Sequence, residues 1–539
     1  MNRCLLFLAL AAALPLASTP LAAQSSTFRF VELAPLAGDV SSAAFSVNHN
    51  GQVAGYSANA DGRRTAVIWT IPASGSSTTP SCTLPHLGGG FSEAYSINDH
   101  GDVVGLAATA TGEPHACLWN RHGVAADLHT LFTSPHAVAL AVNNVQDIVG
   151  YRLGPNFQPQ ALVIRNGILE NWPTTSMQRA TAIDQLRNVV GNGQNSSLNL
   201  AYSARSTRAA TLPTLTGFPN AEVAAINLLG EKAGTLTSED ASQAVLWKGD
   251  RIAPTSLGTL GGKFSRSMGM NQFYSIVGTA QLSDNAQVAA NITTNSTGIT
   301  TATQPPVFND LDRAFWWNAG RMFNLNILTT LPAQWTLQAA TAVNDFNDIV
   351  GYATASGNIR GFALIPSRKP SLALRAYASR IGASYPHGVP AEFWLCANIK
   401  PTDIRVVVDD VEVSRHSSIP YPISITGMSP GYHTLVIRVT AGTSEVKWTG
   451  NFTVLEPPPS NIASSLTLLQ STSQKTESAK SPATTGTSTG FLSRMETWYL
   501  QALSLSRPPA SGVPMPPPAA AEPETTALPP PSPDSALQP

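Results

Sequence analysis

The chain has 539 residues, and 32 Lys and Arg stand against 33 Asp and Glu, which gives a formal net charge of −1 at pH 7. Nucleic-acid-binding domains carry a basic surface, so this balance argues against nucleic acid as a partner. Charged residues make up only 12% of the chain, and its length suffices for a large buried core.

Residues 1–23 have the pattern of a secretory signal. Arg3 supplies the positive start, Leu5–Leu14 is a short apolar run, and Ala22-Ala23 is a small-residue cleavage site. The run is too short to span a bilayer, and no longer apolar run occurs elsewhere. The sequence therefore predicts a secreted protein, extracellular or periplasmic, without a transmembrane anchor.

Three cysteines follow the predicted cleavage site: Cys82, Cys117 and Cys396. An odd number in an exported protein leaves at least one thiol without a partner in the chain, and the sequence does not fix any pairing. The spacing matches neither a disulfide framework nor a thiolate metal site.

A strand is predicted at Phe28–Leu33, and a motif built around one asparagine then recurs seven times between Ala44 and Pro366. The second copy reads Ala94-Tyr-Ser-Ile-Asn-Asp-His-Gly-Asp-Val-Val-Gly-Leu106. Every copy has an Asn or Asp followed seven residues later by glycine. These pairs are Asn48 and Gly55, Asn98 and Gly105, Asn143 and Gly150, Asp184 and Gly191, Asn227 and Gly234, Asn271 and Gly278, and Asn344 and Gly351.

The spacings between successive Asn positions are 50, 45, 41, 43, 44 and 73 residues. A period near that of the shorter spacings suits four short strands per copy, as in propeller blades. The last copy stops after its third strand, at Ile365. The strand at Phe28–Leu33 is therefore predicted to supply the missing fourth strand and to close the ring.

The residue before each Asn is large and apolar, and the one before that is small. The small residues are Ser46, Ser96, Ala141, Ala182, Ala225, Gly269 and Ala342. This alternation predicts a strand, with the small side chains where neighbouring copies approach closely. The Asn then folds onto the backbone of a turn. A glycine inside a strand costs about 0.5–1 kcal/mol, so the repeated glycine is expected to allow a bulge or a close backbone contact.

The remaining segments differ from the repeat. A polar insertion at about 282–310 interrupts the sixth copy, as a binding loop or as a tolerated addition. Residues 371–456 contain alternating runs, and Asp409-Asp410 suits a hairpin turn, which together resemble an immunoglobulin-like sandwich. Residues 457–539 are rich in Ser, Thr and Pro and predict a disordered tail, with a short amphipathic helix near 491–503.

The repeats resemble the bacterial extracellular HAF-repeat family. The resemblance rests on the Ile-Asn-x-x-Gly-x-Val-Val-Gly core, on the later His-Ala-x-x-Trp, and on linkers such as Leu257-Gly-Thr-Leu-Gly-Gly262. The His-Ala-Phe tripeptide that gives the family its name is degenerate here, as His115-Ala-Cys and Arg313-Ala-Phe. The resemblance covers about 28–366 and implies an extracellular scaffold. It supplies no catalytic residue.

Motifs of known chemistry are absent: no nucleophile elbow, P-loop, dinucleotide fingerprint or helical zinc motif occurs. The histidines of the second copy and its neighbours are His86, His100, His115, His122, His129 and His136. Four of them are spaced by seven, which gives no shared direction along strands and turns, so surface or hydrogen-bonded roles are favoured over a metal site. Asp61, Asp99, Asp102 and Asp147 suit turns. The strand-end residues Trp69, Trp119, Trp247 and Trp316-Trp317 suit core packing more than sugar stacking.

The sequence thus predicts an all-β protein: a seven-bladed β-propeller over 28–366, an immunoglobulin-like sandwich over 371–456 and a disordered Pro-rich tail. No catalytic, cofactor-binding or metal residue and no cofactor is assigned. The favoured function is non-catalytic binding or adhesion, with a glycan or a surface protein as partner. A glycan-acting hydrolase or lyase with a site in the propeller channel and a purely structural matrix component stay open, as does the oligomeric state.

Overall fold

The computed structural model describes residues 27–456 except 155–156, 171, 173–176, 196–197, 205–208, 284–310, 369–370, 379–383 and 420–421. The predicted signal peptide, most of the insertion, the tail and its helix lie outside the described residues. Within them, the regular secondary structure is almost entirely strand, with one short helix, α1 (Leu325–Leu328), and one 3-10 turn, η1 (Leu128–Leu131). The all-β prediction is confirmed, and no helix in the described part is long and apolar enough to cross a membrane.

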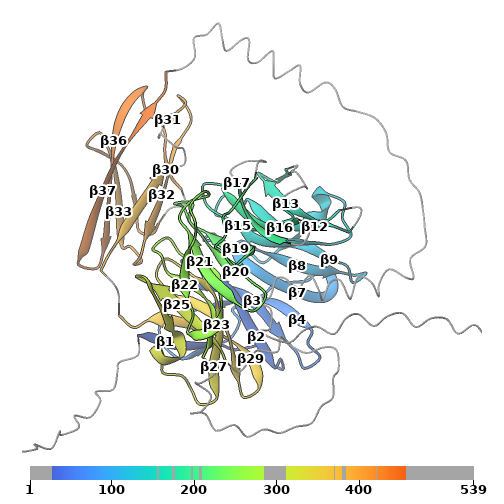
Figure 1. Cartoon of the computed structure of the whole chain (residues 1–539). Coiled ribbons are helices and arrows are strands. Elements are labelled where there is room, and N and C mark those ends of the chain that lie inside the picture. Colours follow the sequence, from blue (N-terminus) through green and yellow to red (C-terminus); the bar gives the residue numbers. More distant parts are fainter. Residues whose placement is uncertain are drawn as a thin grey trace, which may run out of the picture. The chain divides into compact units, whose positions relative to one another are not determined.

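Each repeat forms a four-stranded antiparallel sheet within the described residues (Figure 1). The first three sheets comprise β2 (Ser41–Val47), β3 (Gln52–Ala58), β4 (Arg64–Thr70) and β6 (Cys82–Thr83); β7 (Gly88–Ile97), β8 (Val103–Thr109), β9 (Pro114–Trp119) and β10 (Ala125–Asp127); and β11 (Ala137–Val142), β12 (Ile148–Leu153), β13 (Pro159–Arg165) and β14 (Ile168–Leu169).

The next three sheets comprise β15 (Arg179–Ile183), β16 (Val189–Asn195), β17 (Leu198–Ala204) and β18 (Ala209–Thr211); β19 (Asn220–Ile226), β20 (Lys232–Thr237), β21 (Ser242–Trp247) and β22 (Thr255–Gly258); and β23 (Gly261–Met270), β24 (Ile276–Leu282), β25 (Asp312–Asn318) and β26 (Arg321–Asn324). A single parallel bridge between Ser242 and Phe264 joins the fifth sheet to the sixth.

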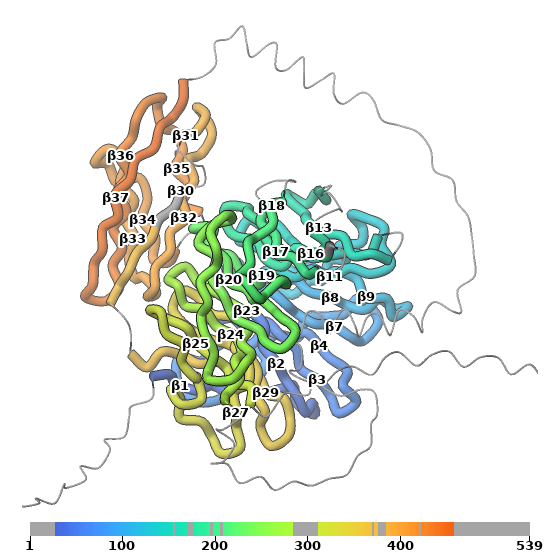
Figure 2. Tube along the Cα trace, in the orientation of Figure 1, coloured from blue at the N-terminus to red at the C-terminus, as the bar shows by residue number. Residues whose placement is uncertain are grey.

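The seventh sheet combines the two ends of the repeat region. It contains β27 (Trp335–Val343), β28 (Ile349–Ala355) and β29 (Asn358–Pro366), and its fourth strand is β1 (Phe28–Leu33). β1 pairs antiparallel with β29, from Phe28 opposite Pro366 to Leu33 opposite Gly361 (Figure 2). The predicted pairing of the N-terminal strand with the last repeat is confirmed. On its other edge β1 pairs with the short β5 (Ser77–Thr78).

Hydrophobic clusters fill the spaces between consecutive sheets. Between the first and second sheets, Ile68 and Leu84 pack with Val103 and Trp119. Equivalent clusters follow for each later pair of sheets, and the last one joins Val350 and Ala363 of the seventh sheet to residues of the first. The seven sheets therefore form a closed cycle of packing contacts.

The repeated Asn fixes one turn conformation. Its Oδ1 accepts hydrogen bonds from the backbone amides two and four residues later; in the second repeat these are His100 at 3.0 Å and Asp102 at 2.8 Å. The residue three positions after the Asn has positive φ in every repeat, between +60° and +87°. It is glycine in three repeats, as predicted, and Gln146, Arg187, Tyr274 or Asn347 in the others.

The Asn amide nitrogen also links one repeat to the next. It donates to the backbone oxygen of the Asn or Asp in the following repeat, at 2.9–3.1 Å, for Asn48 to Asn98, Asn98 to Asn143, Asn143 to Asp184, Asn271 to Asn344 and Asn344 to Asn48. The Asp184 carboxylate cannot donate, and the fourth and fifth repeats are joined instead by Thr181 Oγ1 and Asn192 Nδ2, which both donate to the oxygen of Val223.

The repeated glycine has no room for a side chain. A Cβ atom at Gly150 would lie 2.0 Å from the oxygen of Val138, and the other six glycines meet a backbone oxygen at 1.9–2.1 Å in the same way. Each faces a β-bulge in the first strand of its repeat, such as the register shift between Ala139 and Ala141. The predicted close backbone contact is confirmed. The bulge comes just before the small residue of the motif, so the two residues before the Asn keep the predicted alternation.

The small residues before the Asn contact the next repeat. A Cβ atom at Gly269 would lie 2.8 Å from the oxygen of Thr341, and Ser46 Oγ accepts from the amide of Ile97 at 3.3 Å. The strand-end residues Trp69, Trp119 and Trp247 are fully buried. Each donates its indole N–H to a backbone oxygen at 2.7–2.8 Å, so the predicted core packing is confirmed for these three.

After the repeats, two sheets enclose a separate hydrophobic core. One contains β30 (Leu374–Ala378), β32 (Ala391–Ala397) and β35 (Ile423–Ile425); the other contains β31 (Ser384–Tyr385), β37 (Ser444–Val454), β36 (Gly431–Ala441), β33 (Asp403–Val408) and β34 (Val411–His416). Phe393 and Phe452 meet in that core, with ring centroids 5.3 Å apart. Asp409 and Asp410 have φ of 47° and 65° between β33 and β34, which confirms the predicted hairpin turn.

We expect Gly150→Ala to lower the free energy of unfolding by about 3 kcal/mol or more, because the added methyl group would collide with backbone that has no alternative position. Urea denaturation of the secreted protein measures the effect. Gly249→Ala is the matched control, since its Cβ would meet only the end of the Ile252 side chain, at 3.2 Å. Equal effects of the two substitutions would contradict the steric explanation.

We expect Asn271→Asp to destabilise the protein by about 2 kcal/mol, because the carboxylate keeps the acceptor of the turn and loses the donor to Asn344. Asn59→Asp is the control: Asn59 Oδ1 accepts from the amide of Arg63 at 2.9 Å in an exposed turn, a role that Asp can fill. Thermal melting compares the two variants. A control variant that melts as early as Asn271→Asp would count against the link between repeats.

Candidate functional site

A polar pocket of about 470 Å³ lies at the turns of the second and third repeats. It is lined by residues from three turns: His100, Asp102, Asn120, Arg121, His122, Asn144, Val145 and Gln146. Two of these turns follow the repeated Asn, and the third is the β9–β10 hairpin. The volume falls within the range of small-molecule sites, although polar side chains dominate the lining.

Asp102 is the buried anchor of the pocket wall. Its Oδ2 accepts from Asn98 Nδ2 at 3.0 Å and from Gln146 Nε2 at 2.8 Å, and its Oδ1 accepts from the amide of Arg121 at 3.2 Å. These three donors satisfy the carboxylate, which therefore holds the turns together. It is not free to act on a ligand.

The exposed groups of the pocket are mainly donors. The Arg121 and His122 side chains are exposed, and Arg121 Nε donates to His122 Nε2 at 3.2 Å. The Asn144 side chain is fixed by two hydrogen bonds to Asp99: its Nδ2 donates to Asp99 Oδ2 at 2.7 Å, and its Oδ1 accepts from the Asp99 amide at 2.9 Å. A guanidinium and two imidazoles around a polar hollow suit a hydroxyl-rich or anionic ligand.

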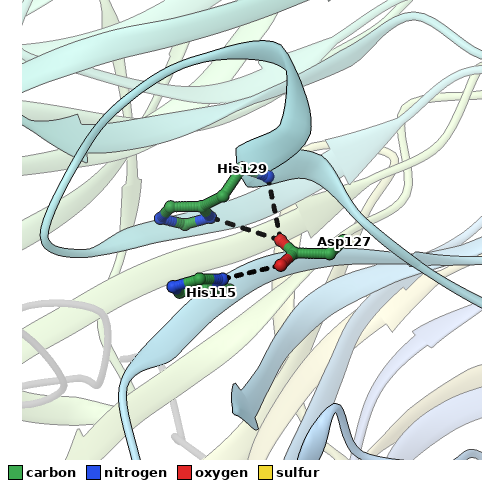
Figure 3. A group of neighbouring side chains, drawn as sticks. All are labelled: His115, Asp127 and His129. Carbon is green, nitrogen blue, oxygen red and sulfur yellow. Dashed lines mark hydrogen bonds and ion pairs between the residues drawn. The ribbon is translucent and has the colours of Figure 1, made fainter. Parts of the chain in front are cut away.

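A second cluster of titratable side chains lies in the same repeat, at the end of the β9–β10 pair opposite to the pocket. Figure 3 shows the rings of His115 and His129 one above the other, with the Asp127 carboxylate beside both. The ring centroids are 3.6 Å apart and the planes differ by 13°. His115 Nδ1 lies 2.8 Å from Asp127 Oδ2, and His129 Nδ1 lies 3.6 Å from Asp127 Oδ1. Two imidazoles and a carboxylate are a donor set that suits a transition metal.

Burial, together with the neighbouring His115 ring, lowers the pKa of His129 to about 4. Burial lowers the pKa of His136 to about 3, and burial and the nearby Asp127 carboxylate raise the pKa of the Cys117 thiol to about 12. At neutral pH the imidazoles of His129 and His136 are therefore uncharged. The Cys117 thiol is protonated and unreactive.

An ion-pair cluster joins the first repeat to the second and the last. His49 Nδ1 lies 2.8 Å from Asp99 Oδ1, and His49 Nε2 lies 3.1 Å from Asp345 Oδ2. Burial works against the charged imidazole, but the two carboxylates overcome it and hold the pKa of His49 well above its ordinary value. Burial likewise opposes charge on Asp99, and the His49 charge lowers the pKa of that carboxyl. These ion pairs therefore join the first repeat to the last, in addition to the packing and hydrogen bonds between them.

The structure separates the histidines that the sequence grouped. His115 and His129 come together because the β9–β10 hairpin folds one over the other, so the expectation of no shared direction is wrong for this pair. His100 and His122 line the pocket, His86 Nδ1 accepts from the amide of Gly88, and His136 is buried near Tyr151.

The other predicted residues hold structural positions. Asp147 is fully buried and forms two hydrogen bonds with Arg187, at 2.6 and 2.7 Å, while Asp61 lies in a turn. Trp316 packs edge-on against Phe28. Cys82, Cys117 and Cys396 are free thiols within the described residues.

Sequence reasoning missed His49, Asp345, Asp127, Arg121 and Gln146. His49 and Asp345 occupy the same position of the motif, one residue after the Asn, in the first and last repeats. That shared position was a signal, because closing the ring brings those repeats together. Asp127 and Arg121 lie in a hairpin outside the motif and gave no signal.

No protein-family model matches the chain, and no curated protein matches it. Among solved structures, the chain is similar to the extracellular domain of a protein described as a hybrid two component system from B. thetaiotaomicron, with 11% identity and a TM-score of 0.37, over 80% of this chain and 60% of that one. A second match is an extracellular domain described as that of a one component system from the same organism, with 9% identity and a TM-score of 0.18, over 77% of this chain and 74% of that one. The chain spans less than two thirds of the length of the first of these.

We expect the stability of the protein to fall as the pH rises above about 7.5, because folded His49 keeps a proton that the unfolded chain has released; below that pH the lowered pKa values of His129 and His136 act in the opposite direction. The stabilisation from the charged His49 imidazole is fully present below the pKa of the unfolded chain and is lost as the pH rises through the raised pKa of the folded state. The free energy of unfolding then falls by up to about 1.4 kcal/mol per pH unit. Asp99, whose pKa is lowered, contributes stability that is fully present above its ordinary pKa and is lost only as the pH falls into the acidic range, so it does not affect this slope.

Urea denaturation between pH 6 and pH 9 measures this slope. His49→Asn should flatten it, whereas His122→Asn, which replaces an exposed imidazole, should leave it unchanged. A parent slope that persists in His49→Asn would show that other groups cause it.

Proposed function

We propose that this chain is a secreted, non-catalytic binding protein that recognises a glycan or another surface protein. Its scaffold is a seven-bladed β-propeller of HAF-type repeats over 28–366, followed by an immunoglobulin-like module over 371–456. The closed cycle of seven sheets and the pairing of β1 with β29 support the propeller. The two sheets around one core support the module.

The single observation that carries the binding function is the polar pocket between the second and third repeats. Its walls are turns whose conformations the repeated Asn residues fix, so little conformational entropy is lost when a ligand is held there. Arg121 and His122 are exposed at the pocket while Asp102 is saturated, which leaves donors facing the ligand. A glycan that carries a carboxylate or sulfate group fits this arrangement best.

The enzymatic alternative has one observation in its favour, the convergence of His49, Asp99 and Asp345. A histidine between two carboxylates is a combination that catalytic sites use. The two carboxylates are almost completely buried and are hydrogen-bonded to backbone amides, Asp99 to His49 and Asp345 to Gln272. This arrangement suits a structural ion pair better than a group that receives a substrate.

A glycan array probed with the secreted protein tests the proposal, with release of reducing ends measured on the same glycans. We expect binding to acidic glycans without release. Arg121→Ala should weaken binding about tenfold or more, since a hydrogen bond to a charged group contributes roughly 1.5–3 kcal/mol.

Arg251→Ala, which removes an exposed guanidinium from the fifth repeat, is the matched control and should bind like the parent. Release of product that depends on His49 would favour the enzyme. If the protein binds no glycan on the array and no surface protein, or if the two arginine variants lose affinity equally, the pocket is not the binding site.

A further inference from the structure

We propose that His115, Asp127 and His129 form a binding site for a divalent transition-metal ion, with Zn²⁺ as the preferred occupant. One donor atom from each side chain lies within 4.8 Å of the other two. The site is distinct from the polar pocket, which contains none of these residues, so it does not depend on the proposed glycan binding.

The backbone places the three side chains before any metal arrives. In the β9–β10 pair, Cys117 lies opposite Asp127, so His115 and Asp127 project from the same face of the sheet. The chain then leaves the strand at Asp127, which accepts the amide of His129 at 2.9 Å and starts the 3-10 turn. This turn lays the His129 ring over His115.

His129 is the observation that points to a ligand. Its side chain is only 8% exposed, and neither ring nitrogen makes a hydrogen bond within the described residues. Burying an imidazole without a hydrogen bond is unfavourable. A metal ion bound to one ring nitrogen would use the lone pair that the fold leaves without a donor.

The donor set selects the metal class. Two imidazole nitrogens and one carboxylate oxygen match three-residue zinc sites, in which the fourth position is open to water or a ligand. Ca²⁺ and Mg²⁺ prefer all-oxygen ligands and are disfavoured. A tetrahedral site needs donor atoms roughly 3.3 Å apart, and the two stacked rings must also tilt away from their parallel arrangement so that a nitrogen of each points at one ion.

The cluster is not part of what the repeat needs to fold. The position of His115, two residues before the partner of the repeated glycine in the third strand, holds Thr65, Gln160, Leu200, Gln243, Arg313 or Arg360 in the other repeats. Those repeats form the same four-stranded sheet without an imidazole there. The sheet therefore does not require these three residues, and the metal site proposed here gives them a role.

Metal binding by the full secreted chain tests the proposal. After dialysis against ZnCl₂ and then metal-free buffer, elemental analysis should find one Zn²⁺ per chain, and titration calorimetry gives its affinity. We expect His115→Gln and His129→Gln each to weaken binding at least about tenfold, and Asp127→Asn to do so with the least change of shape. Co²⁺ should give the visible absorption bands of a tetrahedral site in the parent and lose them in the variants.

His122→Gln is the matched control, because it removes an exposed imidazole from the same repeat and should bind like the parent. Circular dichroism and melting without metal show whether each variant is folded. Zn²⁺ should raise the melting temperature of the parent and of His122→Gln, and not that of the three site variants. No stoichiometric Zn²⁺ in the parent, unchanged binding in folded His115→Gln and His129→Gln, or equal loss in His122→Gln would overturn the site.

Discussion

One recurrent hydrogen bond organises the repeat region, from the side-chain amide of the repeated Asn to the backbone oxygen of the next repeat, and five of the seven joints share it. The same side chain must accept two backbone amides to form its turn and donate to a neighbour that lies about 40–70 residues away in sequence. Among small side chains only Asn offers both an acceptor and a donor in this geometry. The position therefore couples local turn formation to assembly of the cycle.

The candidate sites follow from that coupling. The polar pocket is formed by turns that the Asn residues fix, so its shape is a property of the scaffold. The His49 ion pairs lie one residue after the Asn and join the first repeat to its neighbours on both sides. The His115 cluster differs, because it lies at the outer hairpin β9–β10, where the repeat does not constrain the side chains. Sequence variation there is tolerated, and a local function can be added without disturbing the core.

Much of the fold could be predicted because its causes are local or periodic. The glycine of each repeat and the tryptophans at the strand ends follow from sterics that recur in every copy. The pairing of β1 with β29 followed from the missing strand of the last copy. The glycine predicts a bulge or a close contact, but not which residue forms the bulge, because an extra residue in one strand leaves the apolar pattern on both sides intact. The sites were less predictable still. His115 and His129 meet through a hairpin, and His49 meets Asp345 through closure of the ring, so neither contact is visible as a spacing.

Asp184 stands alone among the seven turn residues in lacking an amide, which makes the cycle unequal around its circumference. Between the fourth and fifth sheets the side-chain bonds come from Thr181 and Asn192, which lie in the strands and not in the turn. A ring whose joints differ in this way has a preferred place to part. The next joint differs as well, because Asn227 donates to Glu231 within its own turn and the fifth and sixth repeats are bonded through Leu228 and Gln272. Mechanical load or heating would be expected to separate the sheets first at one of these two joints.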